Sequence, residues 1–343
     1  MAPYTVTVHP FASPTRGSCA YERGDPSAEN ALVFIGGLTS GPGVSDLTKL
    51  CQSITGSENL SYSVWEFRMR SSYTGFGFSS LANDAEDLAA FVAYLRQTGK
   101  KKVVVMGHST GLHPFPPLLE VCVCLFVDLI HDSRPGCQDC LEYTNRDKYN
   151  SPPVDGYILL APVSDREAAA AFTSQDIIDA TVKTAQDMLA KGKANDTMPS
   201  GSIPPIFASP ITAYRWNSLA AKGYIVPVQS LSLYSRLDSR YANIERTASG
   251  DDDYFSSDLS DQQLQATFGR IHTPVLLLPC ENDELVPPSV DRATLLKRWM
   301  RACPEGRASP DSAFVPGADH AVTQPEEGWT WISDRVLKFL HSV

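Results

Sequence analysis

Short runs of apolar residues recur along the chain. Continuous runs at 31–35, 103–106, 157–161 and 275–278 predict strands that are buried on both faces, and a pair of glycines follows the first of them. Three further strands are predicted at 4–9, where apolar and polar residues alternate, at 62–67, and more weakly at 312–315.

Apolar residues at helical spacing fill the stretches between several of these strands. Residues 81–95 have this spacing, and Ser79 or Ser80 could cap the resulting helix. Residues 166–190, which are rich in alanine, and residues 329–340 also read as helices. Because short apolar strands alternate with helices, the pattern predicts an α/β fold with a mostly parallel sheet flanked by helices.

The strand signal fades between residues 165 and 271. Helix-like sequence dominates there, and residues 195–210 are rich in Pro and Ser. We therefore predict a mostly helical cap at 166–270, inserted into a core formed by residues 1–165 and 271–343.

Composition and charge narrow the class of protein. The chain has 343 residues, of which 43% are hydrophobic, and a net charge of −10, so it is neither disordered nor a small disulfide scaffold. An acidic chain binds nucleic acids and anionic membranes poorly. The apolar run at 118–130 is too short to span a bilayer. The N-terminus has no basic and apolar segments typical of a signal peptide, which predicts a cytoplasmic protein with cysteines that are free thiols.

One pentapeptide carries a strong chemical signal. Gly107-His108-Ser109-Thr110-Gly111 directly follows the apolar run at 103–106. A G-x-S-x-G sequence after a strand is typical of a nucleophile elbow, in which a strained turn exposes the serine hydroxyl. Ser109 is therefore the candidate nucleophile, and the alternative is a structural turn with an idle serine.

A serine nucleophile needs a base, and in this fold the chain order is Ser, then Asp or Glu, then His. His320 lies in the predicted loop between the last strand and the last helix, so it is the candidate base. Asp283, which follows a late strand, is the candidate acid. Asp165 is its main competitor, and Glu281 and Glu284 are close enough in sequence to be mistaken for it.

The oxyanion hole requires backbone N–H groups aimed at the developing charge. Thr110, directly after the nucleophile, is one candidate donor. Leu38 is the other, provided that Gly37 matches the glycine of the usual His-Gly pair. Gly36 stands where histidine is frequent, so a plain glycine turn remains the alternative.

The sequence predicts no metal or cofactor site. Cys137-x-x-Cys140 is a single pair without a second pair or a histidine set at zinc spacing. The glycines between 36 and 43 match neither a dinucleotide fingerprint nor a phosphate-binding loop with its lysine.

Five longer segments resemble a known family. VVVMGHSTG, CQDCLEYTN, SSYTGFGFSSLANDAEDL, GYILLAPVSDREA and GADHAV are similar to a fungal α/β-hydrolase family that includes intracellular esterases of fusarinine-type siderophores. The resemblance covers most of the chain. It implies an α/β-hydrolase fold, no metal, a triad of Ser109, Asp283 and His320, and a substrate pocket lined by Tyr73 and Phe76. It also implies a small-molecule ester substrate, with a hydroxamate siderophore as the candidate, and it leaves the oligomeric state open.

The chain departs from this family at the elbow. Family members run directly from the elbow into its helix, as GHSTGCQD, whereas here residues 112–136 separate Gly111 from Cys137. Prolines 114, 116 and 117 would stop a helix that begins at Gly111. Two function classes follow: a serine esterase, or a non-catalytic binding protein of the same fold whose elbow the insertion disrupts.

The origin of residues 112–136 is a separate question. The segment has 25 residues, and glycine stands at both junctions, so its removal restores STGCQDCLEYTN. These features favour an unspliced in-frame intron. A genuine lid loop is the alternative, because long loops are often functional.

Overall fold

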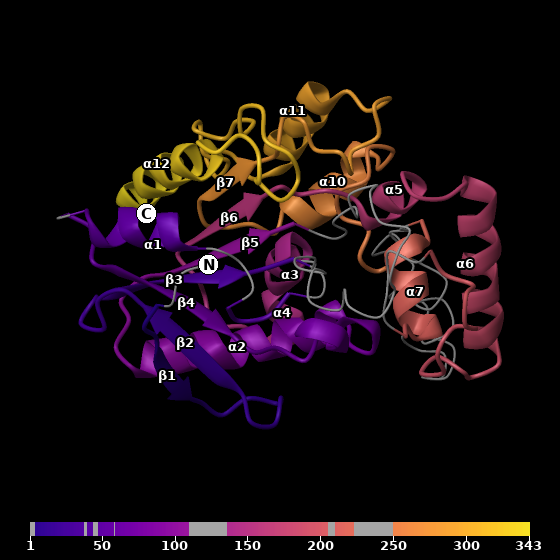
Figure 1. Cartoon of the computed structure of the whole chain (residues 1–343), viewed down its shortest axis with the longest axis horizontal. Coiled ribbons are helices and arrows are strands. Elements are labelled where there is room, and N and C mark those ends of the chain that lie inside the picture. Colours follow the sequence, from indigo (N-terminus) through magenta and orange to yellow (C-terminus); the bar gives the residue numbers. More distant parts are fainter. Residues whose placement is uncertain are drawn as a thin grey trace, which may run out of the picture.

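The fold is described by a computed structural model, which covers residues 4–37, 40–43, 47–57, 59–109, 136–204, 210–222 and 250–343. Its centre is a 7-stranded sheet with the strand order β1-β2-β4-β3-β5-β6-β7. The strands are β1 (Thr7–Pro10), β2 (Cys19–Arg23), β3 (Asn30–Ile35), β4 (Tyr62–Phe67), β5 (Val103–His108), β6 (Gly156–Leu160) and β7 (Val275–Leu278) (Figure 1).

The mostly parallel sheet that the sequence predicts is confirmed. Strands β3 to β7 pair in parallel, while β1 and β2 form an antiparallel edge next to β4. Strand β2 (Cys19–Arg23) was not predicted, because its sequence CAYER lacks an apolar run. Residues 312–315 contribute only an isolated parallel bridge between Val315 and Cys280 instead of the predicted strand, so that prediction is wrong.

Helices cover both faces of the sheet (Figure 1). They are α1 (Thr48–Thr55), the short 3₁₀ helix η1 (Tyr73–Gly77), α2 (Leu81–Gln97), α3 (Gly136–Tyr143), α4 (Arg146–Tyr149), α5 (Asp165–Ala170), α6 (Gln175–Ala190), α7 (Ala213–Ala220), α10 (Asp261–Phe268), α11 (Arg292–Ala302) and α12 (Gly328–Ser342). Ser80 caps α2, because its hydroxyl accepts a hydrogen bond from the backbone N–H of Asn83 at 3.2 Å. The single helix predicted at 166–190 is in fact two helices, α5 and α6, and an extended Ser174 begins the second.

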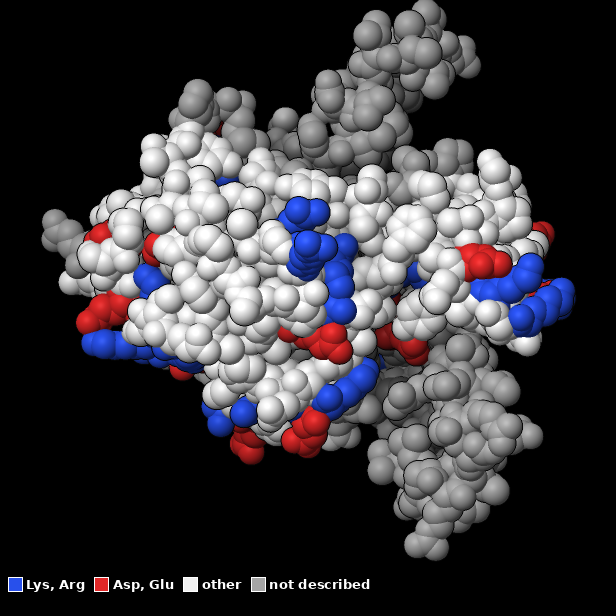
Figure 2. All heavy atoms as spheres, turned by 90° about the horizontal axis from the view of Figure 1, so that it is seen from below, with Lys and Arg blue, Asp and Glu red and all other residues white. Residues whose placement is uncertain are grey.

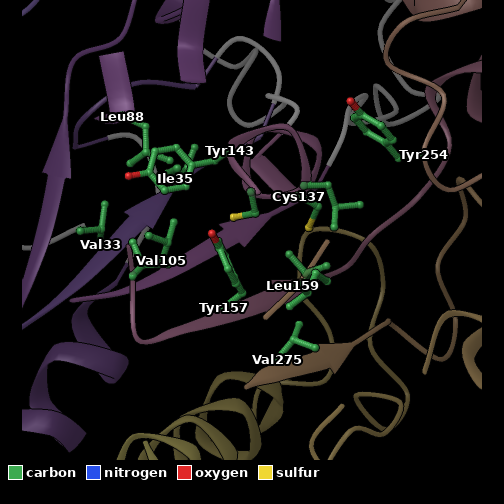
Figure 3. Packing of buried hydrophobic residues seen from close by; sticks show 14 of the residues in the cluster. Val33, Ile35, Leu88, Val105, Cys137, Tyr143, Tyr157, Leu159, Tyr254 and Val275 are labelled. Atoms are coloured by element: carbon green, nitrogen blue, oxygen red, sulfur yellow. The ribbon is translucent and has the colours of Figure 1, made fainter. Parts of the chain in front are cut away.

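Alternate residues of the central strands point to opposite faces of the sheet, where they belong to two separate apolar clusters. Val105 of β5 packs into the cluster that includes residues of α2, α3, α10 and α11, whereas Val104 and Met106 pack against α1 and α12. Figure 3 shows the first cluster, in which Cys137 of α3 lies among residues of the sheet. This burial of both faces explains why the strands read as unbroken apolar runs.

A third apolar cluster lies under the helices of the predicted cap. Ile178 of α6 and Trp216 of α7 pack there with Phe76 of η1 and Leu285. The helices α6 and α7 stand together to one side of the sheet (Figure 1). Helix α10 lies within the predicted cap range of 166–270, but its Phe268 packs in the first cluster beside the sheet. The domain boundaries themselves stay a prediction.

Surface charge and helix lengths bear on possible partners. On the face shown in Figure 2, Lys and Arg side chains occur in small groups, with Asp and Glu side chains among them. Among the helices of the described residues, none is both long and apolar enough to cross a bilayer.

Candidate active site

Ser109 occupies a strained turn at the carboxyl end of β5. Its φ is 63°, in the left-handed region that residues with a side chain rarely adopt. Its backbone N–H donates to the carbonyl of Leu160 at 2.8 Å, which ties the turn to the end of β6. A positive φ at a serine that directly follows a buried strand is the geometry expected of a nucleophile elbow.

The structure brings together the three residues that the sequence proposed as a triad. The Ser109 hydroxyl is hydrogen-bonded to Nε2 of His320, and Nδ1 of His320 lies 2.8 Å from Oδ2 of Asp283. All three side chains are buried. The other Asp283 oxygen accepts the backbone N–H of Leu285 at 3.0 Å, so a second hydrogen bond orients the carboxylate.

The competing carboxylates make different contacts. Asp165 accepts a hydrogen bond from the side-chain amide of Gln138 at 2.9 Å. Glu281 and Glu284 accept backbone N–H groups of the loop that carries His320, from Gly317 at 2.7 Å and from His320 at 2.9 Å. The hydrogen bond to the imidazole ring is therefore made by Asp283.

The residue that packs behind Ser109 is Gly136, the first residue of α3. A side-chain carbon on Gly107 would lie 2.1 Å from the carbonyl oxygen of Gly136, and one on Gly136 would lie 2.8 Å from that of His108. The backbone N–H of Cys137 donates to the carbonyl of Ser109 at 3.2 Å. In an elbow without an insertion, this hydrogen bond joins the serine at position i to the residue at position i+3. Two residues then lie between them, and the second is the last glycine of the G-x-S-x-G motif. Gly136 meets that requirement in space, although 26 residues (110–135) precede it after Ser109.

Both candidate oxyanion donors, Leu38 and Thr110, lie outside the described residues. So does most of the segment 112–136, of which only Gly136 is described. Their roles stay predictions.

The two predicted pocket residues differ in exposure. Phe76 is fully buried within the third cluster, where its ring is a packing residue between η1 and the cap helices. Tyr73 is 43% exposed, and its hydroxyl donates to the carbonyl of Pro42 at 3.1 Å, next to the loop that follows β3. Whether either residue touches a substrate stays a prediction.

The paired cysteines of α3 are buried thiols. Burial raises the pKa of Cys137 and of Cys140 well above the ordinary value, so both stay protonated at neutral pH. Within the described part of the chain, no three His, Cys, Asp or Glu side chains group in a way that could hold a metal ion.

Sequence reasoning did not single out two residues that hydrogen-bond to His320 or to the competing carboxylate Asp165. Gln138 binds the competing carboxylate Asp165, and His108 donates to the carbonyl of His320 at 3.3 Å with its Nε2–H. His108 lies within the elbow motif, but the variable position of that motif carries no chemical signal. Gln138 follows the second junction of the insertion, so only the path of α3 places it here.

Known proteins of similar sequence and structure match this chain over most of its length. "Esterase AN6793" of Emericella nidulans is 31% identical over 324 residues, which is 86% of this chain and 81% of that protein. "Fusarinine C esterase sidJ" of Aspergillus fumigatus is 29% identical over 349 residues, 92% of this chain and 89% of that protein. Among solved structures, "Siderophore hydrolase EstB from Aspergillus fumigatus" is similar, with a TM-score of 0.70, 24% identity, and coverage of 99% of this chain and 98% of that one.

A model of a protein family also matches most of this chain. The family described as "Protein of unknown function (DUF1749)" matches residues 1–114 and 129–341. The match leaves out residues 115–128, which lie within the segment that the sequence singled out as an insertion. The fold is that of the α/β-hydrolases, and because the family match includes nearly the whole chain, this protein belongs to the DUF1749 family.

Proposed function

We propose that this protein is a serine esterase that cleaves a carboxylic ester through an acyl-enzyme. The observation that carries the proposal is the continuous hydrogen-bonded relay from Ser109 through His320 to Asp283. The esterases among its relatives, at about 30% identity over most of the chain, support the same class of reaction.

The chemistry follows from the geometry of the relay. Nε2 of His320 accepts the proton of the Ser109 hydroxyl as its oxygen attacks the ester carbonyl, and the same nitrogen then protonates the leaving alcohol. Water, activated by His320, releases the acid from the acyl-enzyme. Asp283 accepts the Nδ1–H of the ring, which leaves Nε2 unprotonated in the resting state and stabilises the imidazolium once it forms.

Labelling with a fluorophosphonate probe tests the proposal directly. A serine activated by histidine attacks the phosphorus atom of the probe within minutes. An ordinary serine hydroxyl does not react, because without a neighbouring base it stays protonated at neutral pH. We expect stoichiometric modification of the purified 343-residue chain, and peptide mass spectrometry should place the adduct on Ser109. A protein that remains unmodified, although folded by circular dichroism, would instead favour the non-catalytic binding protein.

We propose further that the substrate is a hydroxamate siderophore ester. Two relatives support this narrower class by their names, a fusarinine C esterase and a siderophore hydrolase.

Incubation with fusarinine C tests the substrate. We expect mass spectrometry to detect opened forms that gain one water for each ester cleaved, and desferri and iron-loaded ligand should be compared. Turnover of p-nitrophenyl acetate without any ring opening would leave a general esterase and remove the siderophore from the proposal.

A further inference from the structure

Two adjacent carboxylates hold His320 at two different points. Asp283 binds the ring, with 2.8 Å between its Oδ2 and Nδ1 of His320. Glu284 binds the backbone of the same residue, because its Oε2 accepts the His320 N–H at 2.9 Å. The two contacts share a residue but differ in the group that is bound, which is the imidazole ring for Asp283 and the backbone N–H for Glu284.

Other contacts between the two loops lie further from the imidazole. Glu281 accepts the N–H of Gly317 at 2.7 Å, and the N–H of Asn282 donates to the carbonyl of Ala318 at 2.9 Å. Each of the four consecutive residues 281–284 thus bonds to the histidine loop, and Glu284 is the one that reaches the backbone of His320.

His320 depends on such contacts because it lies in a loop and not in a helix or strand. Gly317 and Val322 on either side have φ angles of 64° and 55°, so the loop turns sharply at both ends. The side chain of His320 is nearly fully buried, and a shift of its backbone by about 1 Å would misalign Nε2 with the nucleophile.

We propose that Glu284 is a positioning residue for the catalytic histidine, acting through its hydrogen bond to the His320 backbone N–H. The inference rests on the proposed function, in which His320 is the base. Glu284 does not replace Asp283 as the acid, and it is not expected to touch the substrate. Its role is to hold the loop so that the imidazole stays in line between Asp283 and Ser109.

Substitutions at Glu284 and Glu281 test this role in the full-length protein with a p-nitrophenyl ester. Glu284→Ala removes the acceptor, and we expect kcat to fall about tenfold with an unchanged KM, because substrate binding is intact while the base is displaced. Glu284→Gln should recover most of the wild-type kcat, because the amide oxygen still accepts the N–H. Glu281→Ala is the matched control, because the carboxylate that it removes belongs to the same segment but binds the N–H of Gly317 and not that of His320. Its kcat should stay within about twofold of wild type.

A fourth variant keeps the test decisive if Glu284→Ala folds poorly. Glu284→Lys puts a donor where an acceptor is needed, so it must be at least as slow as Glu284→Ala, and far-UV circular dichroism identifies the variants that are folded. A wild-type kcat in folded Glu284→Ala or Glu284→Lys overturns the inference, as does an equal loss in Glu281→Ala.

The failure of this inference and the failure of the proposed function are distinguishable. A wild-type chain that neither hydrolyses esters nor reacts with a fluorophosphonate contradicts the esterase itself. An active wild-type chain whose Glu284 variants have an unchanged kcat contradicts only the positioning role.

Discussion

Replacing Ser109 with alanine is expected to abolish ester hydrolysis and to leave the fold intact. The hydroxyl is the nucleophile of the proposed reaction, and the side chain beyond Cβ contributes little apolar packing at this turn. The loss should reach about 10⁶-fold in kcat, because members of a triad act as a unit. Initial rates with p-nitrophenyl acetate, together with far-UV circular dichroism, check both parts of the expectation.

The acid of the same relay offers a matched control. Asp283→Asn should lower kcat by about 10⁴-fold, because the amide NH2 can donate to Nδ1 and so favours the tautomer of His320 whose protonated Nε2 cannot accept from Ser109, and because the neutral amide no longer stabilises the imidazolium. Asp165→Asn removes the same charge from a buried carboxylate that binds Gln138, and it should retain most of the activity. If Asp165→Asn were inactive and Asp283→Asn active, the acid would be misassigned. Full activity of Ser109→Ala would contradict the whole relay.

Removing the insertion at the elbow is expected to give a more stable and more active protein. Deletion of 111–135 joins Thr110 to Gly136, and because Gly111 and Gly136 are identical residues, deletion of 112–136 yields the same chain. We propose that these 25 residues are foreign to the fold. Two observations support this: Gly136 packs where the elbow requires its glycine, and the family match leaves out residues 115–128.

The expected gain follows from chain entropy. In the full chain 26 residues (110–135) separate Ser109 from Gly136, and one remains after deletion. The loop-closure term (3/2)RT ln n then falls by about 3 kcal/mol, which corresponds to a rise of several degrees in the unfolding midpoint. Differential scanning fluorimetry and ester hydrolysis of the two chains, measured side by side, check this. A full-length protein that is both more stable and more active would identify the segment as a functional lid.

The sequence was sufficient for the central parallel strands and for the order of the candidate triad residues along the chain. Strands β3, β5, β6 and β7 are buried on both faces, so their unbroken apolar runs marked them without any tertiary knowledge. Strand β2, which lies between β1 and β4, was not predicted, because its sequence contains no such run. The positions of Ser109 and His320 could also be read from the chain, since each follows a recognisable element and the order Ser, acid, His is a property of the fold.

Tertiary structure decided the choices between chemically equivalent residues. Asp165 and Asp283 both follow a strand, at the ends of the neighbouring strands β6 and β7, and only the path of the histidine loop directs the imidazole to Asp283. Gly111 and Gly136 are both glycine and stand 25 positions apart, and only the close approach of Gly107 to the start of α3 identifies Gly136 as the one that packs behind Ser109. A sequence specifies which side chains are present and in what order, but the hydrogen bonds that distinguish identical groups depend on distances of a few ångströms between segments that are far apart in the chain.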